Sequence, residues 1–179
     1  MKCNHLIGTF GKYIDKNKQI TLLKQKINKL QHKLTKQKQL SLLDDLTGLF
    51  NRRKLLKDIN RYSSIQKRFK IPFYICMIDL DGFKELNDRK GHLIGDKLLQ
   101  KTAKLLCNNI RNYENVYRGY EGDEFFIIFS HSNNPKFLKD KVITTLKRYK
   151  IKASIGIVKL GRNCLKRVDK AMYKDKRSR

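Results

Sequence analysis

The sequence is short of acidic residues and has no long hydrophobic segment. No apolar run approaches the roughly 20 residues that a membrane-spanning helix needs, and the N-terminus lacks the apolar segment of a signal peptide. The four cysteines form no CxxC pair and have no histidine at metal-ligand spacing. We therefore expect free thiols in a reducing compartment and a cytoplasmic protein.

The charge balance is strongly basic, with 42 Lys and Arg against 16 Asp and Glu, which gives a formal net charge of +26. Such a charge favours polyanionic partners such as nucleotides, nucleic acid or an anionic membrane surface. The lysines are spread over every segment, so a general compositional bias explains them equally well and nucleic acid is not favoured. Because acidic residues are few, their positions say more about a functional site than those of the lysines.

An apolar heptad pattern marks the N-terminal segment. Its positions are Ile20, Leu23, Ile27, Leu30 and Leu34. Isoleucine at the a positions with leucine at the d positions favours a parallel dimer. A helix packed against its own domain is the alternative. We predict a helical, short coiled-coil dimerisation segment over residues 1–43 and a second domain over residues 44–179.

The second domain alternates between helical and extended patterns. Helices are predicted at 54–69, 96–109, 135–148 and 163–176, and strands at 73–78, 115–118, 125–129 and 151–158. Residues 81–95 are polar and rich in turn residues. This order predicts an α+β sandwich whose helices cover a mostly antiparallel sheet.

Carboxylates stand at the ends of two of the predicted strands. The run that ends at Ile78 is followed by Asp79 and Asp81, and the turn carrying Asp123 and Glu124 leads into the next apolar run. Carboxylates beside a core are costly unless a cation compensates them. Together they predict a hard-oxygen site for Mg²⁺. The alternative is that they cap helices or pair with surface lysines.

Four separated motifs resemble those of the GGDEF family of diguanylate cyclases, from Asp44 to the end of the chain. They are Asp44–Arg53 (DDLTGLFNRR), Asp79–Asp96 (DLDGFKELNDRKGHLIGD), Glu121–Phe125 (EGDEF), and Ala153–Gly156 (ASIG) with Asp169–Lys176 (DKAMYKDK). Their order and spacing make the match specific. The resemblance implies a palm-like domain in a bacterial signalling enzyme, which joins two GTP molecules into cyclic di-GMP with release of two pyrophosphates. One GTP is held by each subunit of a homodimer.

The resemblance also implies residue roles. Metal ions (Mg²⁺ or Mn²⁺) would be held by Asp79, Asp123 and the Leu80 carbonyl, with Glu124 as a further ligand. Catalysis would rest on Asp123, Glu124 and Lys84. The nucleotide would be bound by Phe83, Lys84, Asn87, Asp96, Lys176 and Arg179. For Asn87 and Asp96, the assigned guanine contacts compete with simple turn and helix-capping roles.

The main departure from the family pattern is Glu121, which replaces the first glycine of the signature turn. Arg118 matches the family's arginine before that turn only if one residue is inserted. A product-inhibition site of the R-x-x-D type has only Arg111–Glu114 (RNYE) as its counterpart. Two alternatives follow: an inactive GGDEF-like module that binds GTP or cyclic di-GMP, and a basic nucleic-acid- or membrane-associated protein on the same scaffold.

Overall fold

The computed structural model describes residues 3–40, 42–130 and 134–178 and divides the chain into two compact units, Met1–Ser41 and Leu42–Arg179. The first unit contains one helix, α1 (Cys3–Leu40). The heptad residues Ile20, Leu23, Ile27, Leu30 and Leu34 are between 43% and 61% exposed. None of the described helices is long and apolar enough to cross a membrane.

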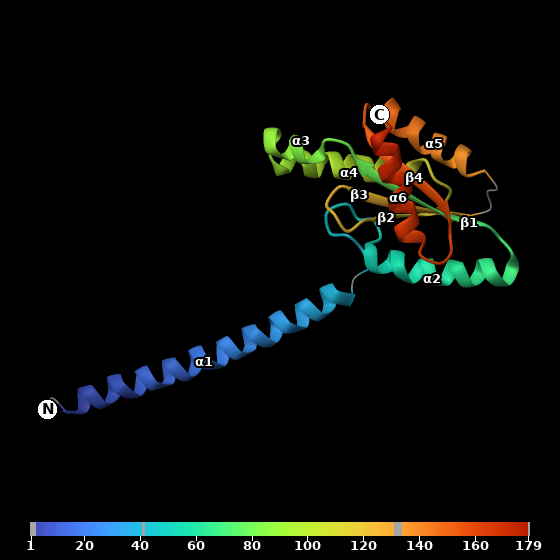
Figure 1. Cartoon of the computed structure of the whole chain (residues 1–179). Helices are drawn as coiled ribbons and strands as arrows, with labels where there is room; N and C mark the ends of the chain where they lie inside the picture. Colours follow the sequence, from blue (N-terminus) through green and yellow to red (C-terminus); the bar gives the residue numbers. More distant parts are fainter. Residues whose placement is uncertain (1–2, 41, 131–133, 179) are drawn as a thin grey trace. The chain divides into compact units, whose positions relative to one another are not determined.

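The second unit is built on a four-stranded sheet in the order β2-β3-β1-β4 (Figure 1). Its strands are β1 (Phe73–Leu80), β2 (Asn115–Arg118), β3 (Glu124–Ser130) and β4 (Ala153–Lys159). All three pairings are antiparallel. The predicted α+β class and the antiparallel sheet are confirmed.

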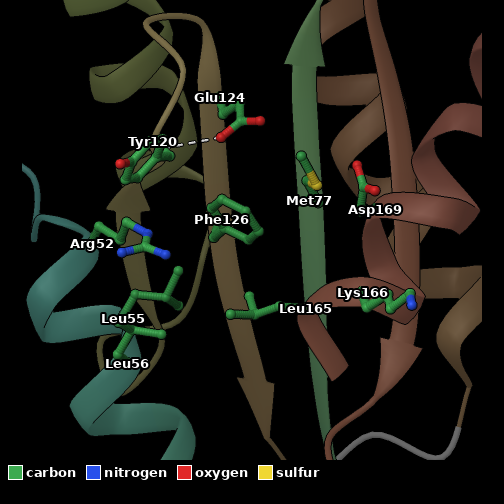
Figure 2. Close-up of a pocket in the computed structure, with 10 residues that line it drawn as sticks. All are labelled: Arg52, Leu55, Leu56, Met77, Tyr120, Glu124, Phe126, Leu165, Lys166 and Asp169. Atoms are coloured by element: carbon green, nitrogen blue, oxygen red, sulfur yellow. Dashed lines mark hydrogen bonds between the residues drawn. The ribbon is translucent and has the colours of Figure 1, made fainter. Parts of the chain in front are cut away.

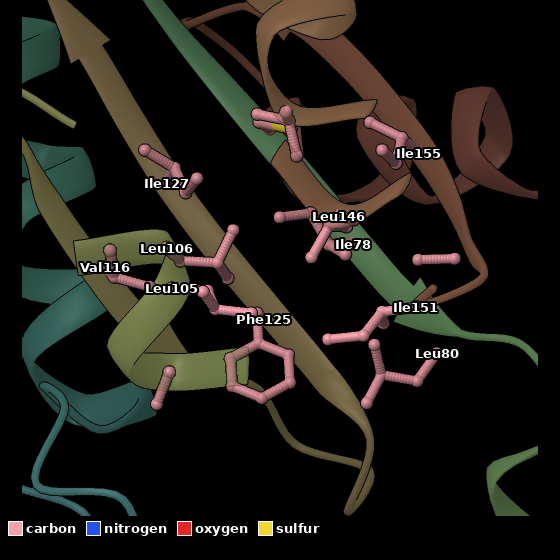
Figure 3. Packing of buried hydrophobic residues seen from close by; sticks show 14 of the residues in the cluster. Ile78, Leu80, Leu105, Leu106, Val116, Phe125, Ile127, Leu146, Ile151 and Ile155 are labelled. Carbon is pink, nitrogen blue, oxygen red and sulfur yellow. The ribbon is translucent and has the colours of Figure 1, made fainter. Parts of the chain in front are cut away.

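Helices cover both faces of this sheet, because the two faces of its strands are both apolar. The first face packs against α4 (His92–Asn108) and α5 (Pro135–Arg148) in a cluster that includes Ile78, Phe125 and Ile127 (Figure 3). The second face packs against α2 (Arg52–Phe69) and α6 (Cys164–Arg177). Side chains alternate along each strand, so β1 contributes to both clusters.

The polar, turn-rich segment 81–95 is largely helical, which the sequence did not predict. It contains a short helix, α3 (Phe83–Lys90), and the first turn of α4, which begins at His92. Gly82 and Gly91 flank α3 with φ angles of 71° and 78°, a region that favours glycine. The eight residues of α3 include no buried one, so they carry no apolar stripe that sequence reading could detect.

The entry segment before α2 is tied to the sheet by backbone hydrogen bonds. The Asn51 side chain caps α2 by accepting a hydrogen bond from the Lys54 amide at 3.2 Å. Asp44 does not cap a helix; it accepts hydrogen bonds from the amide and hydroxyl of Thr47. Phe50 accepts a hydrogen bond from the Arg118 amide at 2.7 Å. The segment therefore acts as a short extension of the edge of the sheet beside β2.

A buried polar network joins α2 to β2. Asp58 is 2% exposed and accepts hydrogen bonds from Lys54 Nζ at 2.6 and 2.7 Å and from the Tyr117 hydroxyl at 2.7 Å. Burial and the neighbouring carboxylate raise the pKa of Tyr117, so its hydroxyl remains a donor. A buried carboxylate is tolerated here because it is fully paired.

Gly156 on β4 allows α6 to approach the sheet closely. A Cβ atom at this position would lie 2.3 Å from the Val168 carbonyl oxygen and 2.5 Å from the Met172 amide nitrogen. We expect Gly156→Ala to lower the free energy of unfolding by about 2–3 kcal/mol, because backbone atoms of α6 must move apart. Gly122→Ala is the matched control, since its Cβ meets no atom within 4 Å. Urea unfolding followed by circular dichroism measures both; equal midpoints would contradict the close-approach argument.

Candidate functional site

Two of the predicted metal-binding carboxylates face each other across the β1–β3 pair. Asp79 is the register partner of Glu124, and directly opposed residues point to the same face of a sheet. That face is the one covered by α2 and α6, since Met77 and Phe126 precede and follow them in the same register. The amide of Leu80 donates to the carbonyl of Asp123 at 3.3 Å, which brings Asp123 to the same end of β1.

Lys176 reaches this cluster from the last turns of α6. Its Nζ atom lies 2.6 Å from Asp79 Oδ2. Asp79 is only 8% exposed, so the pair is half-shielded from water. Hydrogen bonding to Asp79 raises the pKa of Lys176, which keeps the ammonium charged. The structure thus brings Lys176 together with the acidic residues.

Asp123 is a member of the cluster whose negative charge is disfavoured by its surroundings. Partial burial and the negative charge of Asp79 raise its pKa, and Glu124 adds to the effect. A divalent cation beside Asp79 and Asp123 would relieve this repulsion. The described residues contain no group of three or more His, Cys, Asp or Glu side chains that could hold a metal ion. Two carboxylates and a carbonyl suit Mg²⁺, which commonly takes its remaining ligands from water and substrate phosphates.

Glu124 has a second set of partners in the signature turn. Its Oε2 atom accepts hydrogen bonds from the amides of Tyr120 at 3.0 Å and Glu121 at 3.2 Å. Gly119 lies against the same side chain, where a Cβ atom would be 2.3 Å from Glu124 Cβ. Glu121 is exposed. The carboxylate of Glu124 therefore fixes the backbone of the turn in addition to facing Asp79.

The two predicted guanine-binding residues are brought together by the packing of α3 on α4. The Asn87 side chain lies against Gly95, where a Cβ atom would be only 1.9 Å from Asn87 Oδ1. Gly95 directly precedes Asp96. Asn87 Oδ1 is buried and has no hydrogen-bond partner among the described residues. Because α4 begins at His92, Asp96 is not its N-cap, and the capping alternative for Asp96 is wrong.

The other predicted nucleotide-binding residues open α3. Phe83 and Lys84 are the first two residues of this helix, and Gly82 before them makes no side-chain cap. The first amides of a helix have no intrahelical partner and favour an anion. Lys84 is exposed on this surface. Arg179 lies outside the described residues.

Arg118 is the residue of this region whose importance the sequence did not settle. It is 8% exposed, and its Nη2 atom donates to the Gly122 carbonyl, while Nη1 is buried without a partner among the described residues. Burial lowers its pKa, opposed by Asp44 and Asp123. A basic residue on the strand just before the turn was the available signal. The proposed R-x-x-D counterpart is used locally: Glu114 accepts the Arg111 amide at 3.0 Å.

A cavity of about 260 Å³ lies on the α2/α6 face beside the turn (Figure 2). Its floor is apolar, and its rim carries Arg52, Glu124, Lys166 and Asp169. This volume is below the 300–1,000 Å³ typical of small-molecule pockets. Asp79, Lys84 and Asn87 are not among the residues that line this cavity.

Comparison with protein families finds one matching model, described as "Diguanylate cyclase, GGDEF domain", over residues 41–179. Among curated proteins, diguanylate cyclase DosC of Escherichia coli K12 is 34% identical over 116 residues, covering 64% of this chain and 25% of DosC. Diguanylate cyclase DgcZ of the same organism is 40% identical over 94 residues, covering 52% of this chain and 31% of DgcZ. The matched region is thus only about a quarter to a third of these relatives.

The fold has solved counterparts. A sensory box/GGDEF family protein from Caulobacter crescentus superposes with a TM-score of 0.70 at 25% identity, covering 78% of this chain and all of the other. The superposition covers a length of chain close to that of the second unit. It supports the strand order and the helical layers described above.

The raised pKa of Asp123 predicts a pH-dependent stability effect. The folded state disfavours the Asp123 carboxylate, so stability falls as the pH rises from the ordinary value of 3.8 through the raised pKa. We expect Asp123→Asn to raise the thermal midpoint at pH 7 in metal-free buffer, and the gain to disappear below pH 3.8. Asp45→Asn, at an exposed position, removes the same charge as a control. Differential scanning fluorimetry across pH measures both; equal shifts in the two variants would contradict a local cause.

Proposed function

The chain belongs to the GGDEF-domain family of diguanylate cyclases, and on that premise we propose that it condenses two GTP molecules into cyclic di-GMP. In this reaction the 3′-oxygen of each GTP attacks the α-phosphorus of the other. Two phosphodiester bonds form and two pyrophosphates leave. The observation that carries the proposal is the cluster of Asp79, Asp123 and Lys176 at the end of β1.

We assign metal binding to Asp79, Asp123 and the Leu80 carbonyl, with Glu124 as a further ligand. Bound Mg²⁺ or Mn²⁺ would lower the pKa of the attacking hydroxyl and stabilise the leaving pyrophosphate. Within the chain, Asp123 is destabilised as a free carboxylate, which favours an ion at that position. Lys176 holds Asp79 in place at 2.6 Å, and we also assign it a contact with the phosphates of the nucleotide.

We assign the nucleotide itself to residues of α3 and α4, on the chemistry of their donors and acceptors. The amides of Phe83 and Lys84 open a helix without a side-chain cap and suit phosphate oxygens. Asn87 and Asp96 supply the amide and carboxylate that match the N1, N2 and O6 edge of guanine. Asn87 Oδ1 lacks a partner among the described residues, as expected for a group reserved for a ligand.

The reaction needs two nucleotides facing each other, and one subunit is assigned only one. We propose that residues 1–43 form a parallel coiled-coil dimerisation segment and residues 44–179 the catalytic domain. The exposed heptad leucines and isoleucines of α1 support this organisation, since paired helices would bury them. The segment carries no charge complementarity of its own, so apolar contact is what would hold it together.

The competing proposal is an inactive domain that binds GTP or cyclic di-GMP as a regulatory module. Glu121 is the observation that favours it, because this exposed carboxylate stands in the turn two residues before Asp123, an assigned metal ligand. Negative charge near a triphosphate weakens binding. The two proposals share one fold and one nucleotide site and differ only in turnover.

Purified protein incubated with GTP and Mg²⁺ should form cyclic di-GMP, and Asp123→Ala should form none above background. Removing one ligand carboxylate is expected to reduce the rate by about a hundredfold or more. Anion-exchange chromatography separates GTP, the linear intermediate and the cyclic product. A folded, dimeric parent protein that yields no product would overturn the cyclase proposal and leave the binding module.

Glu121→Gly should raise the rate of product formation, because it removes a negative charge from the turn that carries the assigned metal ligands Asp123 and Glu124. We expect an increase of about five- to tenfold in kcat/KM at low salt, which shrinks as salt screens the charge. Glu121→Gln separates charge from side-chain bulk: a charge effect predicts that Gln recovers most of the gain. An unchanged or lower rate in both variants would show that Glu121 is compatible with turnover.

A further inference from the structure

A residue of α2, far from the signature turn in sequence, contacts a side chain of this turn. The guanidinium of Arg52 lies over the Tyr120 ring, with Cζ 4.5 Å from the ring centroid. Arg52 is the first residue of α2, and Tyr120 belongs to the turn that carries Asp123. Figure 2 shows the two side chains together on one wall of the cavity.

The same turn is also held by Glu124. The Tyr120 amide donates to Glu124 Oε2 at 3.0 Å, and the Glu121 amide donates to the same atom at 3.2 Å. Two contacts therefore hold Tyr120. Its backbone amide is hydrogen-bonded to Glu124, and its ring contacts the guanidinium of Arg52. Tyr120 as a whole residue is 76% exposed, so burial alone does not fix it.

Arg52 is itself well anchored. Asn51, directly before it, donates its amide to the Leu42 carbonyl at 2.8 Å and its side-chain nitrogen to the Leu43 carbonyl at 3.1 Å. Phe50 in turn accepts the amide of Arg118, the residue that starts the turn on its other side. The backbone next to Arg52 is thus held by hydrogen bonds at the same edge of the sheet.

We propose that Arg52 is a positioning residue for the signature turn, acting through a cation–π contact with Tyr120. This clasp, meaning the Arg52–Tyr120 pair together with the Glu124 carboxylate, restricts the turn and so sets the position of Asp123. The turn depends on such contacts because Tyr120 and Glu121 are both exposed. As a role in catalysis the inference rests on the proposed function, but the restriction of the turn does not.

The chain offers a matched control on the same helix. Arg68 also belongs to α2 and also lies over an aromatic ring, with Cζ 5.2 Å from the centroid of Phe69. Phe69 is exposed and is the last residue of α2, at the opposite end of the helix from Arg52. Arg68→Gln therefore removes the same charge and the same type of contact without touching the clasp.

The first arm of the test measures the turn itself, by hydrogen–deuterium exchange of the full chain without nucleotide or metal. Arg52→Gln should speed exchange of the Glu121 amide about threefold, as expected for loss of one exposed cation–π contact. Tyr120→Leu should do the same, Tyr120→Phe should keep the parent rate because the ring remains, and Arg68→Gln should have no effect. Parent-like exchange in both Arg52→Gln and Tyr120→Leu would overturn the proposal.

The second arm measures the consequence for Asp123 through the Mg²⁺ dependence of cyclic di-GMP formation. Arg52→Gln should raise the Mg²⁺ concentration for half-maximal rate about threefold and leave KM for GTP at saturating Mg²⁺ unchanged. An inactive parent overturns the proposed function, while the exchange arm still decides the clasp. An active parent with a parent-like Mg²⁺ dependence in Arg52→Gln overturns the positioning role. If Arg52→Gln fails to fold, the Tyr120 pair of variants decides both arms.

Discussion

The antiparallel register between β1 and β3 is the constraint on which the site depends. It runs from Phe73 opposite Ser130 to Asp79 opposite Glu124. The two residues of each apolar pair belong to the same core cluster, and the last pair of the register is acidic. A slip of one residue would exchange the faces, which would turn Asp79 toward α4 and α5 and expose apolar side chains in its place. The packing of the core thus selects the face on which the carboxylates meet.

The same arrangement places negative charges close together, and Lys176 of α6 compensates part of this charge. Asp79 is buried beside the core and has Lys176 at 2.6 Å, whereas Asp123 has an elevated pKa because burial and Asp79 disfavour its charge. The Lys176 side chain is 48% exposed, so this half-shielded pair compensates the charge of Asp79 more than it adds to stability. Gly156 permits the close approach of α6 that brings Lys176 within reach. The helix is therefore packed tightly for an electrostatic reason as well as an apolar one.

The sequence predicted the elements that carry a strong local pattern. The strand 115–118 and the helix 135–148 match the structure residue for residue, since apolar alternation and Asn134 with Pro135 mark their limits. The helix α3 escaped detection because it buries none of its eight residues. The neighbours of Asp123 were anticipated from motifs, but the contacts of Glu124, Arg118 and Arg52 were not. These depend on how a turn folds back in space, which spacing alone does not encode.

The altered turn shows how such contacts change the meaning of a substitution. By sequence, Glu121 removes the first glycine of the signature, which suggests a lost backbone conformation. In the structure the close approach occurs at Gly119, where a Cβ atom would lie 2.3 Å from Glu124 Cβ and 2.7 Å from its Oε2. Gly119 is therefore a position in this turn where a side chain would collide with Glu124. Glu121 then affects the fold little, because its side chain is exposed and its amide is held by Glu124. What remains is an additional negative charge in the turn that carries Asp123 and Glu124, so the departure concerns electrostatics rather than backbone geometry.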